Sequence, residues 1–119
     1  MTDAPRMWTL ALAIAGALFG CHQCGHEDDV GWDSDLVGGA CGQDGDCVER
    51  CIEGGDFPGG TCTVACDHDG ECPQYTACME KEGGVCLLMC DHEDACRPDY
   101  ECRNIDRHGE GGKTHVCIH

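Results

Sequence analysis

Three short acidic loops hold the residues best suited to chemistry, because each places carboxylates between two cysteines. The loops read GQDGD, DHDGE and DHEDA, and a C-x5-C pair encloses each one. Carboxylate oxygens at this density suit Ca²⁺, which takes about 6–8 oxygen ligands at about 2.3–2.6 Å. One interpretation of the loops is therefore weak Ca²⁺ binding, with these carboxylates of the second and third loops as candidate ligands: Asp67, Asp69, Glu71, Asp91 and Glu93.

The same loops also suit tight turns that need no ion. Asp side chains hydrogen-bond to nearby backbone groups, and Gly adopts backbone angles that other residues avoid. Each loop is much shorter than an EF-hand loop and lacks its distal Glu. We expect turns without a cofactor, with Ca²⁺ binding as the alternative.

Cys21 and Cys24 form a C-x-x-C pair near the start of the chain. Covalent haem attachment would need His directly after the second Cys, where Gly25 stands. A redox pair of the thioredoxin type would need a strand-to-helix setting. A metal site that combines Cys24 with His22 and His26 is an alternative, but we expect Cys24 to be a candidate free thiol, able to form an intermolecular disulfide.

Catalysis has little support in the sequence. Ser34 is the only serine in the chain, so the sequence does not support a serine catalytic triad. The segments that begin at His26 and His92 start like H-E-x-x-H but lack its second His. We therefore predict that the protein is not an enzyme.

The spacing of the cysteines repeats along the chain, and this repeat indicates which elements position the loops. The pattern C-x3-C-x5-C-x5-C begins at Cys62 and again at Cys86, 24 residues later. From Cys41 onward the cysteines form three units of four. Four cysteines allow three pairings, and spacing alone does not choose among them. As a working hypothesis we pair first with third and second with fourth: Cys41–Cys51, Cys47–Cys62, Cys66–Cys78, Cys72–Cys86, Cys90–Cys102 and Cys96–Cys117.

The composition predicts a small disulfide-rich fold. The chain has 119 residues, of which 14 are Cys and 18 are Gly. Its few large apolar side chains cannot offset the ordering entropy of the chain, so cross-links must supply the rest. Turn signals flanked by short β-prone runs predict tandem Cys-stapled modules of short β-hairpins and acidic loops, with little helix after the signal peptide. We expect modules at 41–62, 63–86 and 87–119 that share little core.

The first forty residues read as an export signal and a tether. Met7 to Phe19 is an uncharged apolar run, too short to span a bilayer, so residues 1–20 are typical of a signal peptide. Residues 21–40 are acidic and without a periodic pattern. We expect them to form a tether whose Trp32, Leu36 and Val37 fold back on the first module.

Leu18-Phe19-Gly20-Cys21 resembles the lipobox of bacterial lipoproteins, and residues 41–119 resemble the cysteine-rich repeat region of predicted bacterial surface lipoproteins. The resemblance implies cleavage before Cys21 and acylation of its thiol, and hence anchoring of the protein to a membrane. His22 stands where an Asp often retains lipoproteins in the inner membrane, which favours the outer membrane. The family is largely without assigned activity.

The net charge of -16 limits the partners. Such a field repels nucleic acid and favours cations or basic protein patches. The sequence thus predicts a non-enzymatic cell-envelope lipoprotein with a binding or structural display role toward an unknown protein partner. The alternatives are a weak Ca²⁺-binding module of the cell surface and, without lipidation, a secreted Cys-rich inhibitor or toxin-like peptide.

Overall fold

The structure is a computed structural model that describes residues 30–119. The predicted signal peptide (residues 1–20), the lipidation of Cys21 and the free thiol of Cys24 lie outside the described residues. Between residues 30 and 119, no helix is long and apolar enough to cross a membrane.

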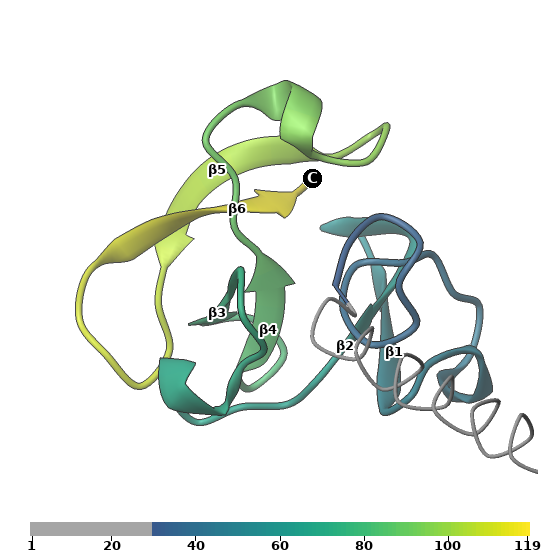
Figure 1. The fold of residues 1–119 in the computed structure, drawn as a ribbon, viewed down its shortest axis with the longest axis horizontal. Coiled ribbons are helices and arrows are strands. Elements are labelled where there is room, and N and C mark those ends of the chain that lie inside the picture. Colours follow the sequence, from purple (N-terminus) through teal and green to yellow (C-terminus); the bar gives the residue numbers. More distant parts are fainter. Residues whose placement is uncertain (1–29) are drawn as a thin grey trace, which may run out of the picture.

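Three antiparallel hairpins form the frame of the molecule. They pair β1 (Arg50–Gly54) with β2 (Phe57–Thr63), β3 (Thr76–Met79) with β4 (Val85–Leu88), and β5 (Glu101–Asp106) with β6 (Lys113–Ile118). Figure 1 shows the β5–β6 and β1–β2 hairpins on opposite sides, with β3 and β4 between them. The fold class is confirmed: the described chain is a small disulfide-rich fold of short hairpins with little helix.

Each C-x5-C loop contains one short 3₁₀ turn. These turns are η2 (Asp44–Asp46), η3 (Asp69–Glu71) and η4 (Glu93–Ala95). In all three, the N–H of the second cysteine of the unit closes the turn by donating to the first turn residue. The equal spacing of the cysteines therefore gives the same local backbone three times.

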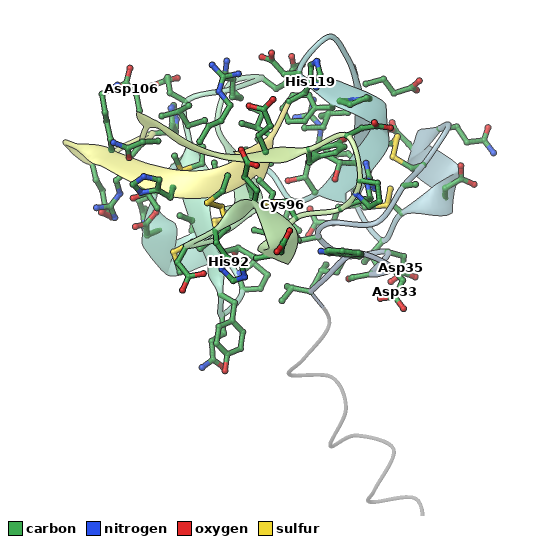
Figure 2. The ribbon with its side chains drawn as sticks, turned by 90° about the horizontal axis from the view of Figure 1, so that it is seen from above. Asp33, Asp35, His92, Cys96, Asp106 and His119 are labelled. Atoms are coloured by element: carbon green, nitrogen blue, oxygen red, sulfur yellow. A yellow bond between two sulfur atoms is a disulfide. The ribbon has the colours of Figure 1, made fainter. Side chains whose placement is uncertain are left out.

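Two disulfides lay each loop on its hairpin. The third and fourth cysteines of a unit are cross-strand neighbours, as in Cys51 opposite Cys62. They bond to the two ends of the loop instead of to each other, so the loop is fixed at both ends (Figure 2). The six bonds are those of the working hypothesis: Cys41–Cys51, Cys47–Cys62, Cys66–Cys78, Cys72–Cys86, Cys90–Cys102 and Cys96–Cys117.

In the first two modules, the glycine two residues before the fourth cysteine lets the hairpin approach the first cysteine of the unit. Gly60 and Gly84 both have positive φ, 73° and 109°. A Cβ at Gly60 would lie 2.0 Å from the carbonyl oxygen of Cys41, and one at Gly84 would lie 2.4 Å from that of Cys66. Only glycine permits this approach between the hairpin and the first cysteine of the unit.

The expectation that the modules share little core is wrong. One apolar cluster takes side chains from all three hairpins: Ile52, Phe57, Ala77, Met79, Val85, Leu87, Tyr100, Val116 and Ile118. A two-stranded hairpin alone has no second layer to cover its apolar face, so it is only marginally stable in water. Here the three hairpins cover one another. The described modules thus form one body, not a string.

The prediction that the tether extends to residue 40 is wrong, because residues 30–40 belong to the folded body. Gly38 and Gly39 exchange backbone hydrogen bonds with Cys62 in β2, at 2.9 and 2.8 Å. Val37 is 1% exposed and packs against sulfur atoms of the second module. Trp32 reaches further, since its indole N–H donates to the Ala95 carbonyl in the third module. The segment therefore contacts all three modules, not the first one alone.

Candidate functional site

Arg97 joins the third module to the first. Its guanidinium donates to the carbonyl oxygens of Gly38 (3.1 Å), Pro58 (3.2 Å) and Gly60 (2.5 Å) and to the hydroxyl of Tyr100 (2.7 Å). The same guanidinium lies 4.4 Å from the centre of the Tyr100 ring. Because hydrogen bonds from a charged donor are stronger than neutral ones, this one side chain holds two distant stretches of the chain together.

Tyr100 completes this junction. Its hydroxyl donates to the Pro58 carbonyl at 3.0 Å, and burial raises the pKa of the phenol while Arg97 opposes that rise. The crevice beside these residues is also lined by Val37, Leu87 and Leu88, and its volume of about 10 Å³ is room for about one water molecule. The crevice is too small for a substrate, and the contacts of Arg97 and Tyr100 join the first and third modules.

In the first loop the carboxylates hold the backbone of their own module. Asp44 accepts a hydrogen bond from the Cys51 N–H in β1 at 3.0 Å, and Asp46 accepts one from the Gly42 N–H at 2.9 Å. The first contact fixes the loop to the hairpin, and the second closes the loop on itself. These are the turn functions that the Asp-rich sequence predicts.

The second loop repeats both contacts. Asp69 accepts from the Cys78 N–H at 2.8 Å and also pairs with Arg107. Glu71 accepts from the N–H of Asp67 at 2.6 Å.

His68 adds a third contact to the same loop, because its Nδ1 accepts from the Gly70 N–H at 3.1 Å. The backbone of the loop is thus held by three side chains of the loop itself. Each of these side chains already has a partner.

The third loop differs from the other two. Asp91 contacts the neighbouring His92, and that hydrogen bond together with the imidazole charge lowers the pKa of the Asp91 carboxyl. Glu93 and Asp94 are exposed. Ala95 stands where Asp46 and Glu71 close their loops. The side chain that contacts this position in the third loop comes from outside it, since the indole N–H of Trp32 donates to the Ala95 carbonyl.

The predicted Ca²⁺ ligands are not brought together. Between residues 30 and 119, the potential ligand atoms that meet in threes within 4.8 Å are cystine sulfurs. Asp69 and Glu71 already accept backbone hydrogen bonds. Asp91 and Glu93 lie in the third loop, apart from the other three candidates, and Asp91 hydrogen-bonds to the neighbouring His92. The arrangement therefore matches hydrogen-bonded turns better than an oxygen-lined ion site.

The cations of the described region are largely used inside the molecule. Lys81 pairs with Asp56 at 2.9 Å, Lys113 with Asp106 at 3.2 Å, and Arg107 with both Asp69 and Glu110. Many carboxylates are left without a positive neighbour. The surface of the body is consequently acidic.

No protein-family model matches the chain, and neither a curated protein nor a solved structure is detectably similar to it. The function has to be inferred from the residues themselves. Sequence reasoning missed Arg97 and Tyr100, the residues that join the modules. A comparison of the repeats contains the signal, since the residue after the second cysteine is Pro73 in one unit and Arg97 in the next.

Proposed function

We propose that the chain is a non-enzymatic lipoprotein of the cell envelope, anchored through acylated Cys21, whose rigid acidic body binds a basic protein surface. The observation that carries this proposal is the locking of three acidic loops onto one shared core by six disulfides. Disulfides in this number are compatible with an exported protein. A loop fixed at both ends loses little entropy when a partner binds it.

The charge distribution supports a basic partner. Internal ion pairs occupy Lys81, Arg107 and Lys113, while the whole chain carries a net charge of -16. An uncompensated field of one sign accelerates association with an oppositely charged surface. The same field disfavours nucleic acid, whose phosphates are also negative.

The local chemistry supports a role other than catalysis. The pKa shift of Tyr100 follows from its burial, and that of Asp91 from the exposed His92 beside it. The crevice at Tyr100 has room for about one water molecule, which is too little for a substrate. The outer membrane remains the location that the lipobox resemblance favours.

Intact mass measured on protein purified from membranes tests the anchor. We expect a chain that starts at Cys21 and is heavier by its acyl groups, with six disulfides and one alkylatable thiol at Cys24. The Cys21→Ser variant should leave the membrane fraction, whereas the matched Cys24→Ser variant should stay in it. An unlipidated soluble chain with all 14 cysteines paired would overturn the proposal and favour a secreted inhibitor or toxin-like peptide.

A further inference from the structure

Three large apolar side chains are exposed next to the third acidic loop. Trp32, Tyr75 and Met89 are 46%, 59% and 47% exposed. We call these three residues the exit face. A fourth exposed apolar residue, Val48, lies on the first module.

Backbone contacts connect the members of the exit face. Met89 donates its N–H to the Tyr75 carbonyl at 3.0 Å, so these two residues are cross-strand neighbours at the open end of the β3–β4 hairpin. Met89 directly precedes Cys90, the cysteine that opens the third acidic loop, and Trp32 hydrogen-bonds to Ala95 near the end of that loop at 2.8 Å. Members of the exit face therefore lie next to both ends of the third loop.

The charged neighbours of the exit face share one side of the molecule. Figure 2 places Asp33, Asp35 and His92 on its lower side, and Asp106 and His119 on its upper side. Asp33 follows Trp32 directly in the chain, and His92 belongs to the third loop. Two carboxylates, Asp33 and Asp35, therefore lie on the same side of the molecule as His92 in the third loop, and Asp33 is the chain neighbour of Trp32.

Tyr75 is exposed, and its backbone has a strained conformation. Its φ is +72°, a left-handed conformation that a bulky residue rarely adopts, in a turn that the Thr76 N–H closes on the Pro73 carbonyl. In the third module the same turn position holds Asp99, a residue type that tolerates this conformation better. The side chain of Tyr75 is exposed and fills no core, so this strained position gives the folded body no packing in return and leaves the ring open to a contact outside it.

The length of chain to the anchor indicates what that contact is. Nine residues lead from Cys21 to Val30, where the described body begins. At about 3.3–3.6 Å per residue they can separate the body from the membrane by about 30 Å at most. We propose that the exit face docks onto the surface of the membrane that holds the anchor, an inference that rests on the proposed lipidation of Cys21.

The residue types fit this surface. Trp and Tyr are enriched at membrane–water interfaces, because their rings are apolar at one end and polar at the other. A short tether keeps the body at high effective concentration near the bilayer, so even a weak contact is populated. The neighbouring carboxylates limit the contact to zwitterionic lipid, since anionic headgroups repel them.

Fluorescence of Trp32 tests the docking. Removal of the signal peptide removes Trp8, which leaves Trp32 as the only tryptophan. Lipidated protein is reconstituted in phosphatidylcholine vesicles that contain a phospholipid brominated near the headgroup. We expect strong quenching of Trp32, loss of most of it in the Tyr75→Ser/Met89→Ser variant, and no loss in the Glu82→Gln control at the other end of the hairpin.

Lipid charge gives a second signature of the same contact. Quenching should fall as phosphatidylglycerol replaces phosphatidylcholine, and salt should partly restore it by screening the carboxylates. Circular dichroism and thermal midpoints of both variants should match those of the parent, which separates lost docking from lost folding. Unquenched Trp32 on phosphatidylcholine, or quenching that the double variant leaves unchanged, would overturn the inference.

The experiment separates failure of the docking from failure of the anchor. If intact mass shows no acyl chains, the proposed lipidation is wrong. The Cys21→Ser chain is then held on the same vesicles by an N-terminal histidine tag and a nickel-chelating lipid. Quenching in that form would support the exit face independently of the anchor, while its absence would reject the face. Self-association of tethered chains, measured by cross-linking, would assign the face to a second copy and also overturn the inference.

Discussion

The second and third acidic loops have the same backbone and different side-chain contacts. Both are enclosed by C-x5-C, both contain a 3₁₀ turn, and both are fixed by two interlaced disulfides. In the second loop Asp69 and Glu71 hold backbone N–H groups. In the third loop Glu93 and Asp94 are exposed. The cysteines thus determine the path of the chain. Single substitutions decide whether the carboxylates of a loop hydrogen-bond to the backbone of their own module or make no such bond.

A second difference between the modules concerns the residue after the second cysteine. Pro73 in the second module starts a turn and makes no long-range polar contact through its side chain. Arg97 at the same place in the third module reaches three carbonyl oxygens of the first module region. The third module therefore has fewer side-chain contacts within its own loop than the second, and its Arg97 holds the first-module region in place.

The largest expected effect comes from removing the Arg97 contacts. The Arg97→Met variant should lose about 2–4 kcal/mol of unfolding free energy, because the carbonyls of Gly38, Pro58 and Gly60 lose a charged donor. Guanidinium unfolding followed by circular dichroism, with disulfides intact, measures the loss. The matched Arg103→Met variant removes an exposed arginine of the same module and should change stability by about 0.5 kcal/mol or less. Equal effects of the two changes would show that Arg97 does not join the modules.

The two loops themselves provide a smaller and more direct comparison. The Asp69→Ala variant should lose about 1–2 kcal/mol, because the Cys78 N–H and Arg107 both lose a partner. At the equivalent position, Glu93→Ala should stay within about 0.5 kcal/mol of the parent. Thermal unfolding of both variants in the same buffer measures the difference. A Glu93→Ala loss as large as that of Asp69→Ala would mean that the third loop also depends on its carboxylates.

The cysteine spacing made the hairpins and loops predictable. A turn signal between the third and fourth cysteines predicts a hairpin, and a five-residue loop between the first two has few conformations. Contacts between modules were not predictable in this way, because they depend on single side chains without a periodic pattern. Trp32 and Arg97 reach carbonyl groups more than fifty residues away in the sequence. Nothing in their immediate neighbours indicates those partners.

The folded conformation of residues 30–40 was not predictable from the sequence either. Their sequence has no strand or helix period, and the acidic residues around Val37 are typical of a solvated tether. Val37 is nevertheless 1% exposed, because Gly38 and Gly39 pair with β2 and draw it against the cystines of the second module. Two glycines and one valine are too weak a pattern to predict a strand-like contact. The tertiary fold decides their conformation.

The smallest expected effect concerns two histidines at equivalent positions, His68 in the second loop and His92 in the third. His68 Nδ1 accepts the Gly70 N–H and so carries no proton on that nitrogen, whereas His92 Nδ1 faces the Asp91 carboxylate and donates to it. The His92→Gln variant removes the imidazole charge, so the pKa of Asp91 should rise toward its ordinary value. NMR titration of the Asp91 carboxyl carbon measures the shift, and His68→Gln, which is remote from Asp91, should leave its titration unchanged.

The direction of the Asp91 shift also fixes the pH at which this contact matters. Because the pKa of Asp91 is lower in the folded than in the unfolded chain, its contribution to stability is present above the unfolded pKa of about 3.9 and disappears as pH falls through the folded value. Both side chains are exposed, so this contribution should be small even above about pH 5, where it is fully present. If Asp91 titrates identically with and without His92, the third loop lacks this side-chain contact as well, and its conformation depends on the two disulfides, the backbone bond of the 3₁₀ turn and the Trp32 hydrogen bond to Ala95.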